Sequence, residues 1–67
     1  MDAEIGDAAG RIWRALSDSG PMSKARIVKA TGLSADLVNQ GIGWLVREGK
    51  LEREQMAKGG QTIRLRP

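Results

Sequence analysis

The sequence of 67 residues contains no cysteine, histidine, phenylalanine or tyrosine. Without Cys and His it has no disulfide, no thiolate or imidazole metal ligand, no thiol nucleophile and no side chain that ordinarily exchanges protons near neutral pH. These absences exclude most enzyme chemistry. No apolar run approaches the roughly 20 residues that cross a bilayer, and the first residues lack the pattern of a secretory signal. We therefore expect a soluble, cytoplasmic protein with no cofactor, metal, small-molecule substrate or membrane partner.

The length allows one small domain over residues 1–67. A chain this short buries only about 60% of the surface that it exposes when unfolded, so its core is thin. Eleven Lys and Arg oppose eight Asp and Glu, a net charge of +3. Residues 1–18 carry four acids and two bases, and residues 19–67 carry four acids and nine bases, so the charge changes from −2 to +5. The basic remainder favours a polyanionic partner, although an ordinary solvated surface explains it too.

Three helices are predicted from apolar side chains that recur every three or four residues. The first covers 3–18 and ends at a Ser-Gly-Pro stop. The second covers 24–31 and the third covers 35–48, and a glycine follows each of them. Ser23 and Ser34 precede these two helices and are suitable N-caps. Local signals alone thus predict a helix followed by a helix-turn-helix, together with the residues at which these helices begin and end.

After the third helix the apolar period changes from 3.6 to 2, which predicts a β-hairpin around the turn at 57–61. We expect a register in which Glu54 faces Arg64. In the same register Glu52 faces Arg66, so the solvent face carries a ladder of opposite charges. The other face then presents to the core Leu51, Ile63 and Leu65.

This order of elements is that of a winged helix-turn-helix domain, and the chain resembles that family most closely between Ile27 and Leu51. The residues that carry the resemblance are Ile27, Thr31-Gly32-Leu33-Ser34, Val38, Ile42, Leu45, Gly49 and Leu51. The resemblance implies an α+β fold of three helices followed by a C-terminal β-hairpin wing, in the order α-α-α-β-β. A short strand at 21–23 is an optional addition to this order.

A narrower group of small stand-alone winged-helix proteins of unknown role is similar in two further segments, "IGDAAGRIWRAL" and "GWLVREGK". The similarity to this group spans nearly the whole chain. It implies the fold strongly and the activity weakly, because winged helices bind DNA, RNA or other proteins.

In the family's docking mode, the start of the second helix and the wing contact phosphates on either side of the third helix. No acidic residue occurs between Pro21 and Ala35, so the Lys and Arg side chains in this stretch have no neighbour of opposite charge in the sequence. Arg64 and Arg66 are set aside because glutamates are expected to face them. The resemblance therefore assigns phosphate contacts to Ser23, Lys24, Arg26, Lys29, Arg47, Lys50 and Lys58.

The third helix would turn Asp36, Asn39, Gln40, Gly43 and Arg47 away from the core. The amides of Asn39 and Gln40 can bond an adenine edge in a bidentate manner, and Gly43 would let a DNA backbone or a partner chain approach closely. These three residues are therefore the predicted base-reading group. A solvated amide face is the alternative, because the stretch 34–46 contains no Lys or Arg.

Glycines inside the helices need a compensating role, since each costs about 1 kcal/mol relative to alanine. Gly41 is expected to admit a neighbouring helix, with Trp13 filling the gap. Gly6 and Gly10 lie beside Trp13 on one flank of the first helix, and Trp44 lies at the border of the core. Gly6, Gly10, Trp13 and Trp44 are the predicted seam of a homodimer; the alternative is that both tryptophans are simply the bulk of the core.

Together these observations favour a winged-helix protein that binds double-stranded DNA without catalysis, as a homodimer and in the manner of a transcription regulator. The alternative is a protein-protein interaction module of the same fold, which is favoured because the outer face of the third helix lacks Lys and Arg over residues 34–46. Enzyme function is the third and weakest reading, because no histidine is present to activate the hydroxyl side chains.

Overall fold

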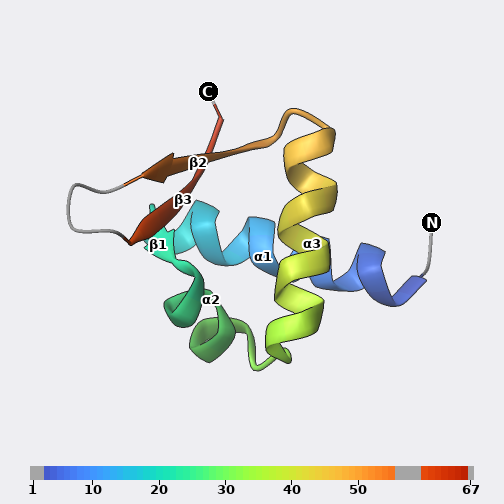
Figure 1. Ribbon diagram of the computed structural model, residues 1–67. Helices are drawn as coiled ribbons and strands as arrows, with labels where there is room; N and C mark the ends of the chain where they lie inside the picture. The colour runs from blue at the N-terminus through green and yellow to red at the C-terminus, as the bar shows by residue number, and fades with distance from the viewer. Residues whose placement is uncertain (1–2, 56–59, 67) are drawn as a thin grey trace.

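The computed structural model describes residues 3–55 and 60–66, which form helices and a small sheet (Figure 1). The elements are α1 (Ala3–Ser19), β1 (Met22–Ser23), α2 (Lys24–Thr31), α3 (Ala35–Arg47), β2 (Leu51–Gln55) and β3 (Gln61–Leu65). The expected α+β fold of three helices and a hairpin wing is confirmed, and the optional strand is present as β1. Two helix ends differ from the prediction by one residue: α1 includes Ser19, and α3 ends before Glu48.

Serine caps begin the second and third helices as predicted. The Ser23 hydroxyl oxygen accepts a hydrogen bond from the backbone N–H of Arg26 at 3.2 Å. The Ser34 hydroxyl oxygen accepts one from the backbone N–H of Leu37, also at 3.2 Å. Between the helices, Gly32 adopts a left-handed φ of 71° and donates its N–H to the carbonyl of Val28. A side chain would be strained at this φ, so glycine is what permits the turn.

We expect Ser23→Ala to lower the free energy of unfolding by about 1 kcal/mol, because it removes the acceptor for an N–H group at the start of α2. Urea denaturation followed by circular dichroism measures the change. Ser17→Ala is the matched control: Ser17 lies exposed inside α1, where alanine is the better helix former. Equal losses in the two variants would contradict the capping role.

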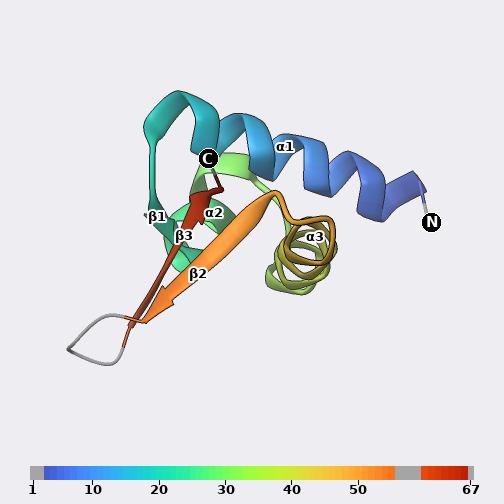
Figure 2. The same ribbon diagram turned by 90° about the horizontal axis from the view of Figure 1, so that it is seen from above.

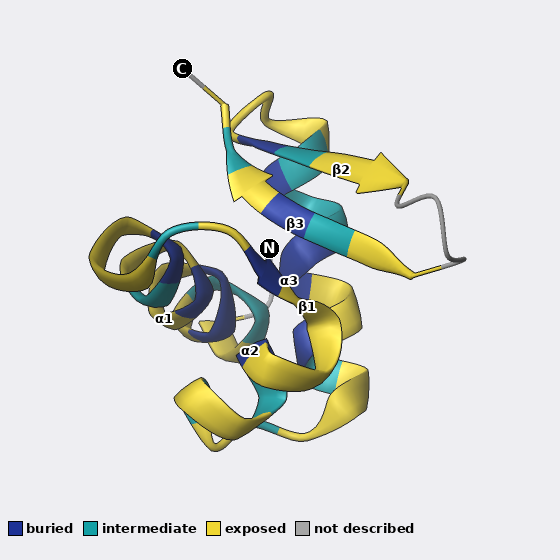
Figure 3. Cartoon of the chain, turned by 90° about the vertical axis from the view of Figure 1, so that its left-hand side faces the viewer, coloured by how far each residue is buried: buried dark blue, intermediate teal, exposed yellow. Residues whose placement is uncertain are grey.

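The core lies where α1 crosses α3 and where the sheet covers one end of that crossing (Figure 3). Figure 3 shows buried positions of α1, α3 and β3 turned inward, while much of α2 is exposed. Every helix and strand contributes at least one buried apolar side chain: Ala8, Ala9, Ile12, Leu16, Met22, Ile27, Val38, Ile42, Leu45, Leu51 and Ile63. The predicted apolar stripes are therefore the ones that meet.

Gly41 marks the closest approach of α1 to α3. A Cβ atom at this position would lie 2.6 Å from Cδ1 of Ile12 and 3.3 Å from the backbone nitrogen of Ala9. The predicted close approach is therefore present, but the expectation that Trp13 fills the gap is wrong. Ile12 fills it and is fully buried, whereas Trp13 is 45% exposed. The two side chains leave α1 about 100° apart, so only one of them can face Gly41.

The sheet has the strand order β1-β3-β2, and both pairings are antiparallel. Glu52 lies opposite Arg64 and Glu54 lies opposite Thr62, so the predicted hairpin register is wrong by two residues. The observed register sets Leu51 against Leu65 on the core side, which the predicted one does not. Because a shift of two residues does not exchange the faces of a strand, Leu51 and Ile63 are still buried as expected.

Candidate nucleic-acid interface

In Figure 2 α1 runs along one side of the molecule, and α3 and the hairpin lie on the other, although the end of β3 reaches α1. On α3 the side chains of Asp36, Asn39, Gln40 and Arg47 are exposed, and Gly43 is partly exposed. Within the described residues, the amides of Asn39 and Gln40 form no hydrogen bond. The donors and acceptors that a base edge requires are therefore unused by the chain itself.

A strand that precedes α2 ties this helix to the hairpin. Ser23 pairs with Thr62 in β3, and the same residue caps α2. Its hydroxyl oxygen accepts the cap hydrogen bond, which leaves the hydroxyl proton available to donate to an anion. Lys24 is the next residue, so the start of α2 is held beside the first residues of β3.

The three basic side chains of α2 do not form one stripe. Lys24 and Arg26 leave the helix about 160° apart, because two helical steps rotate by about 200°. Arg26 shares a side of the helix with Ala30, which lines a hollow against α1. A helical wheel therefore separates Arg26 from Lys24, and it places the exposed Lys29 about 60° from Arg26 and about 140° from Lys24. The sequence already carried this signal, since a helical wheel of α2 separates these positions.

The Lys and Arg side chains near α3 and in the hairpin differ in whether a carboxylate lies close to them. Among the described residues, no carboxylate lies within 4.0 Å of the charged groups of Lys24, Arg26, Lys29, Arg47 or Lys50. Arg64 instead contacts Glu52 at 2.8 Å, and Arg66 contacts the same glutamate at 3.7 Å. Arg64 also lies 4.0 Å from Glu54, so both hairpin arginines are partly neutralised by glutamates, as expected. Lys58 lies outside the described residues.

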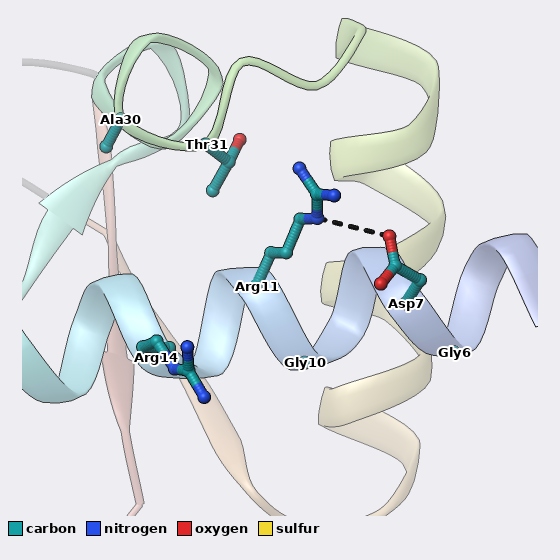
Figure 4. Close-up of a pocket in the computed structure, with 7 residues that line it drawn as sticks. All are labelled: Gly6, Asp7, Gly10, Arg11, Arg14, Ala30 and Thr31. Atoms are coloured by element: carbon teal, nitrogen blue, oxygen red, sulfur yellow. Dashed lines mark ion pairs between the residues drawn. The ribbon is translucent and has the colours of Figure 1, made fainter.

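A hollow of about 610 Å³ lies between α1 and the end of α2 (Figure 4). Its ion pair joins Arg11 Nε to Asp7 Oδ2 at 3.1 Å, with both side chains exposed. The Thr31 hydroxyl donates to the carbonyl of Ile27 and accepts from the N–H of Leu33, so it serves the helix end. In residues 3–55 and 60–66, no cluster of three acids suits a metal ion. Asp7, Arg11 and Thr31 of this hollow are thus engaged in local structure.

A second groove, of about 520 Å³, lies between α1 and the end of α3. It brings together all four residues of the predicted seam, namely Gly6, Gly10, Trp13 and Trp44. Lys50 and Arg66 also line it, which sequence reasoning did not anticipate because they come from separate elements. Lys50, assigned to phosphate by the resemblance, therefore lies at the edge of this groove.

The helix-turn-helix, the β1 tie and the hairpin define a winged helix-turn-helix protein. The chain belongs to the family described as "Winged helix-turn-helix domain (DUF2582)", a family of unknown function whose model matches residues 1–64. This confirms the resemblance noted in the sequence. No helix of the described residues combines the length and the apolarity that a membrane span requires.

Two solved structures share this fold. The solution NMR structure of protein BT2368 from Bacteroides thetaiotaomicron is 28% identical with a TM-score of 0.85, over 94% of this chain and 76% of that one. BpsR from Bordetella bronchiseptica is 27% identical with a TM-score of 0.81. Its structure concerns the regulation of its DNA binding by 6-hydroxynicotinic acid. That match covers 90% of this chain but only 43% of BpsR. No curated protein sequence matches the chain.

Proposed function

We propose that this chain is a noncatalytic, cytoplasmic winged-helix protein that binds duplex DNA in the manner of a transcription regulator. The observation that carries the proposal is that, within the described residues, the exposed amides of α3 form no hydrogen bond and the Lys and Arg side chains of α2 and of the end of α3 form no ion pair. The tie through Ser23 supports it, because it fixes the start of α2 against the hairpin. The likeness to BpsR supports it further, since that protein binds DNA.

In this proposal α3 enters the major groove, which is wide enough for one helix. Asn39 and Gln40 then meet base edges, and an adenine offers the N6 donor and N7 acceptor that an amide matches. Gly43 has no neighbouring atom within 4 Å of a Cβ built upon it, so packing within the chain does not explain this glycine. A DNA backbone or base edge that approaches α3 closely would.

Phosphate contacts supply most of the affinity in the proposed complex. Asp36 is the only charge between Ser34 and Val46, and it repels phosphate, so the groove-facing helix itself attracts DNA weakly. The attraction comes from the flanks: Ser23 and Lys24 at the start of α2, Lys29 farther along the same helix, and Arg47 at the end of α3. Binding of this kind releases counterions and therefore weakens steeply with salt.

Fluorescence anisotropy with a labelled duplex, repeated over a salt series, tests the proposal. Contacts to four or five phosphates give a slope of about −3 to −5 in a plot of log affinity against log salt concentration. Absence of binding at about 50 mM salt, where phosphate contacts are strong, would contradict the proposal. That result would favour a protein-protein interaction module of the same fold.

Asn39→Ala is expected to relax the preference for adenine at one position of the site, by about 1–3 kcal/mol of discrimination. Binding to a duplex randomised at single positions, followed by sequencing of the bound fraction, measures the preference. Lys29→Ala is the control, because loss of a phosphate contact weakens binding to all sequences alike. An unchanged preference in Asn39→Ala would show that this amide reads no base.

A further inference from the structure

The charged side chains of the hairpin differ between its two faces. On the face turned away from the core, Glu52 lies opposite Arg64 and Glu54 lies opposite Thr62. Arg64 lies 2.8 Å from Glu52 and 4.0 Å from Glu54, and Arg66 lies 3.7 Å from Glu52. Two carboxylates thus meet two guanidinium groups, so this outer face is balanced in charge.

The inner face of the hairpin, which packs on the helices, carries one ionisable side chain among the described residues of β2 and β3. Because successive side chains of a strand alternate, the inner positions are Leu51, Arg53, Gln55, Gln61, Ile63 and Leu65. Leu51 and Ile63 are buried in the core. Arg53 lies directly opposite Ile63 but is exposed. The ionisable group of the inner face is therefore an arginine at the rim of the core.

The guanidinium group of Arg53 has no ionic partner in the described part of the chain, where no carboxylate lies within 4.0 Å of it. Its neighbours along the strand, Glu52 and Glu54, point to the outer face. In the strand order β1-β3-β2, β2 is an edge strand, so no further strand of this sheet covers its free side. The positive charge of Arg53 is therefore open to an anion from outside the chain.

Arg53 lies on the side of the sheet that faces the helices. β2 follows α3 in the chain, and the two elements are in contact. Two residues separate Arg53 from the buried Leu51, which is a step of about 7 Å along the strand toward the turn. Figure 2 shows that the hairpin projects past the helices in this direction. The step therefore takes the side chain from the core to its rim without changing the face.

We propose that Arg53 binds a backbone phosphate of the duplex that α3 enters. The inference rests on the proposed function and adds a contact from the described part of the hairpin. A guanidinium group can donate two parallel hydrogen bonds to phosphate oxygens, which adds geometric specificity to the attraction. Because phosphate contacts position a protein without reading sequence, Arg53 helps to orient α3 in the groove.

A second role for this residue needs no DNA. A charge that points inward on an edge strand prevents two sheets from joining edge to edge. If Arg53 had only that role, loss of its charge would cause self-association and leave the affinity for DNA unchanged. The phosphate contact predicts the reverse, so the two roles are separable by experiment.

Arg53→Gln and Arg64→Gln form a matched pair, because they remove one positive charge each from opposite faces of the same hairpin. Fluorescence anisotropy with one labelled duplex, at several salt concentrations, compares them. We expect Arg53→Gln to weaken binding about 5-fold near 0.15 M salt and to make the slope of log affinity against log salt shallower by about 1. Arg64→Gln should change the affinity by less than about 2-fold and keep the slope, because its charge points away and is balanced by glutamates.

Arg53→Lys keeps the charge and should therefore keep the slope of the wild type. Circular dichroism establishes that each variant is folded. If the wild type binds but both glutamine variants lose the same affinity, or Arg53→Gln loses none, the assignment of Arg53 is wrong and the proposed function stands. Unchanged affinity together with larger species in sedimentation would assign Arg53 to protection of the edge strand instead. If the wild type does not bind at about 50 mM salt, the proposed function is wrong and this contact with it.

Discussion

Reversing the charge of Lys24 and Lys29 together is expected to reduce duplex binding by about 100-fold near 0.15 M salt. Each lysine replaced by glutamate exchanges an attraction to phosphate for a repulsion, and neither has a carboxylate partner among the described residues to compensate. The slope of log affinity against log salt should become shallower by about 2, because about two phosphate contacts are lost. Anisotropy titration of the double variant at several salt concentrations measures both effects.

The matched control reverses Arg11 and Arg14 on α1, which line the hollow between α1 and the end of α2 (Figure 4). The net charge changes by the same amount, so general attraction to a polyanion falls equally in both variants. The control also removes the exposed ion pair of Arg11 with Asp7, which contributes little to stability. Equal losses in the two variants would show that binding follows net charge, and the assignment of α2 to the DNA interface would be wrong.

Placing leucine at position 41 is expected to unfold most of the chain. Already a Cβ atom at Gly41 would lie 2.6 Å from Ile12 and 3.3 Å from the backbone of α1, so a larger side chain forces the two helices apart. Overpacking of this kind costs about 3 kcal/mol or more, against a total stability of about 3–10 kcal/mol for a chain of this size. The far-ultraviolet circular dichroism signal and urea denaturation measure the loss.

Gly43→Leu is the control on the same helix, two residues away. No atom lies within 4 Å of a Cβ at Gly43, so leucine fits there and removes the helix cost of glycine. We expect this variant to be as stable as the wild type or more stable by up to about 1 kcal/mol. If both leucine variants unfolded alike, the close approach at Gly41 would not be the cause.

The elements could be predicted from the sequence because their signals are local. Ser23 and Ser34 cap the helices that follow them, and Gly32 permits the turn between those helices, whatever the rest of the chain does. The register of the hairpin was not predictable in the same way. Glutamates recur at every second residue of β2, and arginines do so at the end of β3, so two registers bring glutamates opposite arginines. The choice depends on packing against the core, which a strand pattern does not contain.

The crossing of α1 and α3 shows a second limit of sequence reasoning. Gly41 correctly indicated a close approach, but Ile12 and Trp13 both lie near the apolar arc of α1. Which one faces Gly41 depends on the rotation of α1 about its axis, and that rotation is fixed by packing of the whole core. The exposed Trp13 then lines one groove with Trp44. Lys50 and Arg66 also line that groove. Their presence there depends on where α3 and β3 end in space, which no local sequence pattern indicates.

The central place of β3 in the sheet has a consequence for biosynthesis. β1 pairs with β3, yet this hydrogen-bonding partner is made about 40 residues later in the chain. As the polypeptide leaves the ribosome, the helices can form from local contacts, but Met22 lacks Ile63 and the start of α2 stays untied until the chain has been made as far as Leu65. Nascent chains arrested before residue 61 should therefore expose β1 to proteases that the finished domain resists.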